Sequence, residues 1–133
     1  MKNFLELFGR YRYKLQNISY VSKEEEDDSE PFSFYDEYKL LESNSEKITI
    51  DYTRYAKTNT GILFDLSITF RIEHFYNNDQ DYDLDDYDIP EEIDSNIDFF
   101  SADLISKVSL LIAEITSNFG QFPIITNPSF TKE

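Results

Sequence analysis

The segment that most restricts the fold of this chain is residues 101–118, which have the pattern of one long amphipathic helix. Its apolar residues recur with the helical period and form a single stripe, made of Leu104, Ile105, Val108, Leu111, Ile112 and Ile115. Gly120 can adopt the left-handed conformation that ends many helices, and Pro123 prevents the helix from resuming. Because one face of such a helix must be buried, we expect it to cover an apolar sheet.

The sequence before this helix has the two-residue period of β-strands. Residues 62–76 alternate almost without interruption, and their inward positions are Ile62, Phe64, Leu66, Ile68, Phe70 and Ile72. Residues 48–56 place Ile48, Ile50, Tyr52 and Ala56 on one face. The loop at 57–61 ends in a glycine and is short enough to join the two strands as an antiparallel hairpin.

Two further strands are predicted nearer the N-terminus. Residues 11–20 alternate with a change of phase near Gln16 and Asn17, which indicates a β-bulge, and residues 32–41 resume strand character. We therefore predict an α+β fold with an antiparallel sheet of about four strands. The long C-terminal helix packs on one face of this sheet.

Composition limits the class of protein. The chain has 133 residues, which favours a single domain over 1–133, and its acidic residues gather in two predicted loops, at about 23–31 and 77–95. A formal net charge of −15 argues against nucleic acid and against anionic membranes as partners. The N-terminal residues lack the apolar core of a signal peptide and no apolar run approaches a membrane span, so we expect a cytoplasmic protein.

No residue set points to catalysis, a metal or a cofactor. The sequence has no cysteine, and His74 is its only histidine, so a zinc site would need carboxylates alone. The acidic residues from Asp81 to Glu92 partly match a calcium-binding loop, but Asp86 stands where that loop needs glycine. We predict a protein that is not an enzyme, and we interpret this acidic segment as a solvated loop.

Three segments, taken in order, resemble the SecB family of protein-export chaperones. Residues 13–22 are similar to the first strand of the family, and residues 48–76 to its central hairpin. The most specific match is residues 111–130, in which the helix end is followed by a Gly-x-Phe-Pro turn and a tail that closes in Pro-x-Phe. The helix start at 95–103 departs from the family pattern, and the acidic positions with which the family docks the SecA motor have no clear counterparts here.

The resemblance implies an ATP-independent chaperone or adaptor that binds non-native polypeptide. Its partners would be unfolded or extended segments, of an export client or of a toxin–antitoxin system, and it would form a homodimer or a tetramer of two dimers. The strands also have more aromatic residues than one helix can cover, which fits a groove for another chain. We expect five aromatic residues near this groove: Tyr52, Phe64, Phe70, Phe122 and Phe130.

The alternative is an acidic decoy that binds a host defence protein, such as a phage-type inhibitor of a nuclease. Its partner surface would include Asp81, Asp83, Asp85 and Asp86, whose carboxylates would imitate phosphates.

Overall fold

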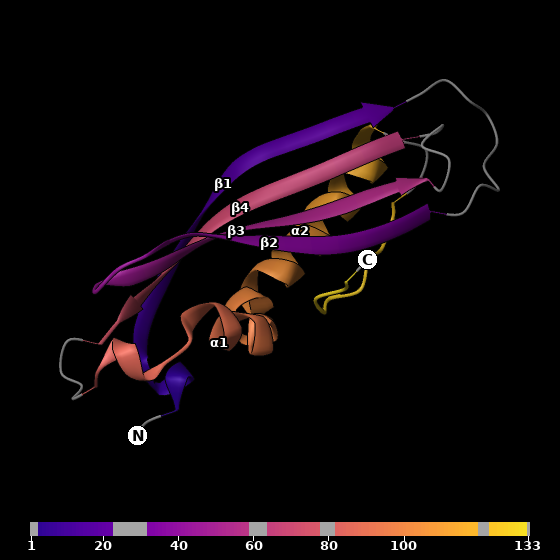
Figure 1. Ribbon diagram of the computed structural model, residues 1–133. Helices are drawn as coiled ribbons and strands as arrows, with labels where there is room; N and C mark the ends of the chain where they lie inside the picture. Colours follow the sequence, from indigo (N-terminus) through magenta and orange to yellow (C-terminus); the bar gives the residue numbers. More distant parts are fainter. Residues whose placement is uncertain (1–2, 23–31, 59–63, 78–81, 120–122, 133) are drawn as a thin grey trace.

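The computed structural model describes residues 3–22, 32–58, 64–77, 82–119 and 123–132. A 3₁₀ turn, η1 (Phe4–Leu7), precedes four strands: β1 (Phe8–Ser22), β2 (Phe32–Ser43), β3 (Lys47–Thr58) and β4 (Phe64–Tyr76). A second 3₁₀ turn, η2 (Leu84–Asp86), and two helices, α1 (Ile89–Ser95) and α2 (Ile97–Phe119), follow. The strands form one antiparallel sheet in the order β1-β4-β3-β2 (Figure 1).

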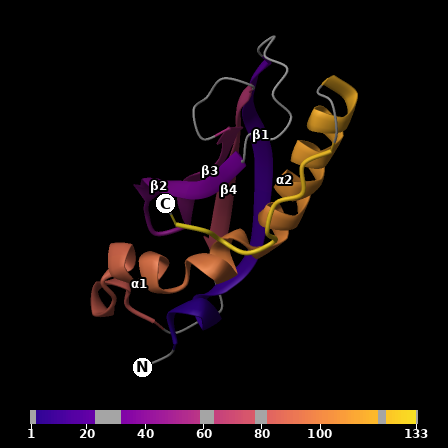
Figure 2. The same cartoon turned by 90° about the vertical axis from the view of Figure 1, so that its right-hand side faces the viewer.

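The molecule has two layers, the twisted sheet and the helices on one of its faces. Helix α2 runs along this face, and the C-terminal segment returns beside it toward β2 (Figures 1 and 2). Helix α1 and η1 lie together at the end of the sheet that is close to the N-terminus (Figures 1 and 2). Strands β1 and β2 are the two edges of the sheet.

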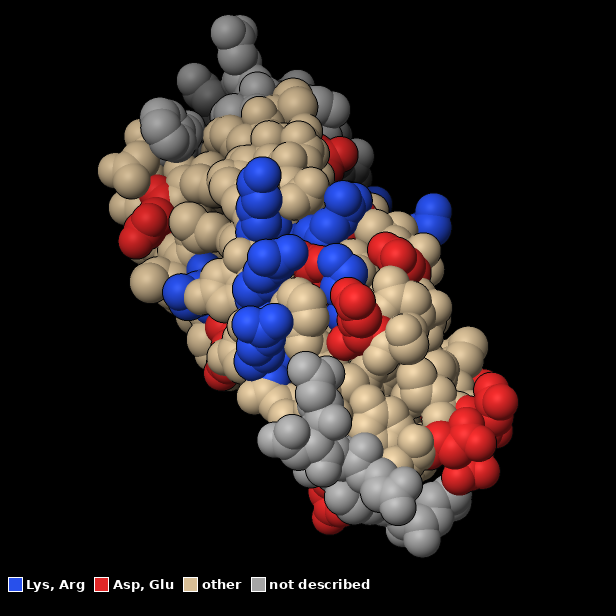
Figure 3. Space-filling view, turned by 90° about the vertical axis from the view of Figure 1, so that its left-hand side faces the viewer, with Lys and Arg blue, Asp and Glu red and all other residues tan. Residues whose placement is uncertain are grey.

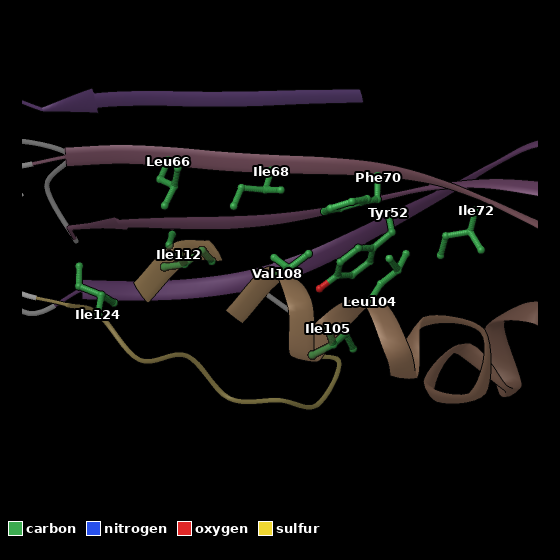
Figure 4. Packing of buried hydrophobic residues seen from close by; sticks show 11 residues of the cluster. Tyr52, Leu66, Ile68, Phe70, Ile72, Leu104, Ile105, Val108, Ile112 and Ile124 are labelled. Atoms are coloured by element: carbon green, nitrogen blue, oxygen red, sulfur yellow. The ribbon is translucent and has the colours of Figure 1, made fainter. Parts of the chain in front are cut away.

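Two apolar clusters hold the layers together. The larger one joins alternate residues of β3 and β4 to the apolar stripe of α2, with Ile124 closing one end (Figure 4). The smaller cluster joins η1 to the other end of the sheet and to the start of the helical segment, through Phe4, Leu7, Ile48, Ile50, Tyr76, Ile93, Ile97 and Phe100. Each fully buried aliphatic side chain of this kind contributes about 1.5–3 kcal/mol to folding.

The antiparallel four-stranded sheet and the helix on its face are confirmed. The predicted bulge in β1 is present as a register shift between Leu15 and Asn17. The prediction of one continuous acidic loop over 77–95 is wrong in its second half, which contains α1. Asp88 caps this helix by accepting a hydrogen bond from the Glu91 backbone N–H, and Pro90 lies in its first turn, where a proline costs no hydrogen bond.

A buried ion pair, which the sequence analysis missed, fixes the C-terminal segment to the sheet. Arg54 of β3 and Asp36 of β2 both face inward, and their side chains are fully buried. The guanidinium donates to both carboxylate oxygens, from Nε to Oδ1 and from Nη2 to Oδ2, each at 2.7 Å. Its remaining hydrogens reach the carbonyl oxygens of Asn127 at 2.6 Å and Ser129 at 2.9 Å. One side chain thus links two strands to the returning tail.

Removal of one partner of this pair should be strongly destabilising, because a buried charge then has no counterion. We expect Arg54→Met to lower the free energy of unfolding by about 3–5 kcal/mol. The double variant Arg54→Met, Asp36→Leu should be more stable than Arg54→Met, because it leaves no unpaired buried charge. Urea titration followed by circular dichroism measures both values.

The matched control is the exposed pair of Arg71 and Asp51, which has the same two-bond geometry at 2.9 and 3.1 Å. Arg71→Met should cost less than about 1 kcal/mol, because water solvates the remaining carboxylate. Equal losses from Arg54→Met and Arg71→Met would contradict the role assigned to the buried pair.

Candidate polypeptide-binding surface

The edge strand β1 presents an apolar strip on the face of the sheet that bears the helices. We call Tyr11, Tyr13, Leu15, Ile18 and Tyr20 the β1 strip, because each pairs across the ladder with an inward-facing residue of β4. Tyr11, Leu15 and Ile18 are 47%, 42% and 40% exposed, whereas their β4 partners are at most 6% exposed. The apolar face of the sheet therefore continues beyond the part that α2 covers.

Helix α2 borders the β1 strip with side chains of mixed character. Lys107 lies over the ring of Tyr13, with Nζ 4.9 Å from the ring centroid. Tyr11 donates a hydrogen bond from its hydroxyl to Asp103. Further along α2, Leu110 is 61% exposed and Leu111 is half-buried. The strip and this flank of α2 offer apolar surface with two charged groups beside it.

A pocket of about 300 Å³ lies at one end of this surface, where β1 and β4 meet the start of α2. Its walls are mainly aromatic, and we call it the aromatic pocket: Phe8, Tyr11, His74, Phe99 and Phe100, with Asp103 beside them. Ile72 and Leu104 complete the apolar part of the lining. Such a pocket has the size and the apolar lining to accept a side chain, and one carboxylate lies within reach.

His74 is the buried centre of the aromatic pocket. The imidazole makes an edge contact with Phe100 at 4.9 Å between centroids and stacks on Tyr11 at 5.4 Å. Its Nε2 lies 3.2 Å from the Phe100 carbonyl oxygen, which fits a neutral ring that donates this hydrogen bond. Burial lowers the pKa of His74 below its ordinary value, although the bond to Phe100 acts in the opposite direction. The ring is therefore a wall of the pocket and is neutral at pH 7.

Three of the five aromatic residues predicted near a groove, Tyr52, Phe70 and Phe130, lie in or against the apolar clusters. Tyr52 is fully buried under α2, where its hydroxyl donates to Asp36 at 2.6 Å, and Phe70 is 6% exposed (Figure 4). Phe130 is half-buried against Tyr52 and both apolar clusters. Phe64 pairs with β1 through its backbone, and its side chain lies outside the described part of the structure, as does Phe122.

Sequence reasoning selected Tyr52 and Phe70 because they lie on the most regular strands, but regular alternation is the mark of a covered face. The β1 strip has the same period in the sequence. Its signal is weaker because the bulge after Leu15 changes the phase. Nothing in the sequence identified β1 as an edge.

The described acidic residues of the alternative hypothesis, Asp83, Asp85 and Asp86, belong neither to the β1 strip nor to the lining of the aromatic pocket. Asp81 lies outside the described residues. Asp83 caps η2 by accepting a hydrogen bond from the Asp85 backbone N–H at 3.0 Å, and Asp85 and Asp86 are exposed. Within the described ranges, no group of three or more His, Asp or Glu side chains is placed to hold a metal ion. No described helix combines the length and the apolar character that a membrane span requires.

Comparison with known proteins identifies the fold. No family model and no curated protein sequence matches the chain. Among solved structures, it is similar to the Mycobacterium tuberculosis SecB-like chaperone Rv1957, solved with a ChAD peptide from the Rv1956 HigA1 antitoxin. The TM-score is 0.70 at 7% identity, over 89% of this chain and 85% of that one. A Streptococcus agalactiae protein of unknown function aligns with a TM-score of 0.46 at 12% identity, over 89% of this chain and 97% of that one.

The buried histidine predicts a pH dependence of stability. In the unfolded chain, histidine has a pKa near 6.5, and in the folded chain the pKa of His74 is lower. The unfolded state therefore binds the proton first, and the stability from this residue is complete above pH about 7.5 and falls as the pH drops through 6.5. The slope for one proton cannot exceed about 1.4 kcal/mol per pH unit.

Urea titrations at pH 8, 7 and 6 test this expectation. His74→Gln keeps a donor for the Phe100 carbonyl but cannot be protonated, so its stability should change less over this range. Glu73, the neighbouring acid, has a pKa lowered to about 2 and does not titrate here. Parallel pH profiles for the two proteins would show that His74 does not cause the dependence.

Proposed function

We propose that this chain is an ATP-independent chaperone or adaptor that binds extended apolar segments of non-native polypeptide. The observation that supports this most is the exposed β1 strip, which continues the apolar face of the sheet to an open edge. An extended client segment laid along it would bury side chains at the two-residue period of the strip. The aromatic pocket would take one larger side chain of the same segment.

The structural neighbour supports a polypeptide ligand. It has a SecB-like fold and was solved with a peptide from an antitoxin. By analogy, we propose an extended segment of an antitoxin or of an export client as the partner of this chain. At 7% identity the likeness concerns the fold, so the proposal depends on the exposed surface of this chain. No comparison favours the acidic decoy.

We also propose that two copies associate through β1. Among the described strands, β1 pairs only with β4, so the other backbone edge of this 15-residue strand is open. Long open edges are pairing sites, and antiparallel addition of a second β1 would give one continuous sheet. The two β1 strips would then lie side by side on the helix-bearing face and form a wider apolar floor.

The first test is suppression of aggregation of a reduced, unfolded client at a stoichiometric amount of chain. We expect wild-type protein to suppress light scattering, and the double variant Leu15→Ser, Ile18→Ser to bind an unfolded peptide at least about ten-fold more weakly. Each substitution removes roughly 1 kcal/mol or more of apolar burial with the client. Fluorescence anisotropy of a labelled unfolded peptide gives the affinity.

Ile125→Ser is the matched control, because Ile125 is 72% exposed and belongs to the C-terminal segment and not to β1. This variant should bind as the wild type does. If wild-type chain neither suppresses aggregation nor binds the peptide, the chaperone proposal fails. If the Ile125→Ser and the double variants lose binding equally, the β1 strip is not the site.

Association through β1 is tested separately by light scattering over a concentration series. We expect a mass of at least twice 15.8 kDa at micromolar concentration. A mass near that of one chain throughout the series would exclude the dimer and leave the client-binding proposal standing.

A further inference from the structure

The face of the sheet opposite the helices has a concentration of positive charge that is unexpected in a chain of net charge −15. Arg10, Arg12 and Lys14 alternate along β1 and pair across the ladder with Phe75, Glu73 and Arg71. We call these three cations the basic row; all three are exposed. Figure 3 shows Lys and Arg side chains gathered in a row on one face of the molecule, with few acidic groups between them.

Neighbouring strands add two cations to this face, Lys47 and Arg71, each of which pairs with a carboxylate. Glu73 accepts hydrogen bonds from Arg12, at 2.6 Å, and from Lys47, so two cations share one carboxylate. These bonds hold the pKa of Glu73 at about 2, so its charge is constant at neutral pH. Arg71 pairs with Asp51. Among the described residues, these five cations and two carboxylates leave an excess of three positive charges.

Arg10 and Lys14 have no ion-pair partner among the described side chains. The Arg10 guanidinium lies over the ring of Phe75, 4.6 Å from its centroid, and Arg12 lies 5.4 Å from the same ring. A cation held over an aromatic face keeps its outer N–H groups free to bind an anion. Lys14 makes no ion pair with any described residue, and Arg71, its partner across the ladder, has the same sign.

We propose that the basic row binds an acidic, extended segment of a partner polypeptide. Alternate residues of a strand lie about 6.6–6.8 Å apart on one face, and an extended acidic segment presents carboxylates at the same period. Such a segment would pair Asp or Glu at every second position with Lys14, Arg12 and Arg10. Arg12 and Lys14 lie on the face opposite the β1 strip, apart from the surface proposed for apolar clients, and Arg10 also lines the aromatic pocket.

The charge of the whole chain favours a short acidic peptide over nucleic acid. At physiological ionic strength, fields are screened beyond about 8 Å, so a short segment experiences mainly the local excess of positive charge. A nucleic acid extends beyond this patch and would meet the acidic remainder of the chain, and three to five cations are few for phosphate-dominated binding. Binding to the basic row should therefore be weak and sensitive to salt.

The test uses the full chain and a fluorescein-labelled peptide of alternating Glu and Ser residues, with fluorescence anisotropy at 50 and 300 mM NaCl. We expect saturable binding at 50 mM and at least about five-fold weaker binding at 300 mM. Arg10→Gln, Arg12→Gln, Lys14→Gln should weaken binding about ten-fold or more. Glu73→Gln, which removes the carboxylate between the cations, should strengthen it about two- to five-fold.

An exposed cation away from the basic row provides the matched control. Lys132→Gln removes charge without touching the row and should leave binding within two-fold of wild type. Circular dichroism confirms that each variant is folded. The opposite response of Glu73→Gln keeps the test valid even if the triple variant unfolds.

Three results would overturn the proposal. The first is no binding of the acidic peptide at millimolar concentration. The second is equal binding of a Lys-Ser peptide, which would show that charge is not recognised. The third is tighter binding of single-stranded oligothymidine that responds to the same variants, which would assign the row to nucleic acid.

Discussion

The buried pair of Arg54 and Asp36 is the interaction on which the arrangement of this molecule depends. Two charged side chains at adjacent inward positions of β3 and β2 could not stay there without each other, because an isolated buried charge is prohibitively unstable. Their spare hydrogen-bonding groups are satisfied by the C-terminal segment, through the Asn127 and Ser129 carbonyls and the Thr131 backbone N–H. The tail must therefore return across the sheet, and this keeps Ile124 and Phe130 on the apolar core.

The sequence predicted the sheet and the helix, but it did not predict the buried ion pair that fixes the tail to them. Regular alternation in residues 62–76 and the helical stripe from Leu104 to Ile115 predicted the sheet, the helix and the face on which they meet. In the alternation of residues 48–56, position 54 is an inward position occupied by arginine. The inward direction of Arg54 could be predicted from Tyr52 and Ala56, which lie two residues before and after it. Its partner could not, because Asp36 is 18 residues away and the sequence does not show which strands pair.

The candidate binding surface was less predictable than the fold, for a related reason. An aromatic residue on an alternating strand is equally consistent with a core and with a groove, and only the order of strands in the sheet decides between them. Tyr52 and Phe70 lie on the two central strands and are covered by α2, whereas Leu15 and Ile18 lie on an edge and remain exposed. Helix α1 was not predicted for a similar reason. Its N-cap, Asp88, is one of many aspartates in this segment, so it does not stand out in the sequence as a helix start.

The side chains on the two faces of β1 restrict the register in which two copies of this edge strand could pair. Its helix side is apolar and its opposite side is positive only in its first half, since Asn17 and Ser19 follow Lys14 on that side. If two copies pair antiparallel about Asn17 and the bulge residue is left unpaired, Lys14 lies opposite Ser19 and Arg12 opposite Val21, so no two cations face each other. Pairing about Arg12 instead places Arg10 opposite Lys14, and like charges directly opposite are destabilising. The basic row would therefore favour a register centred in the second half of the strand. There Ile18 widens the apolar floor, and the two basic rows lie at opposite ends of the pair.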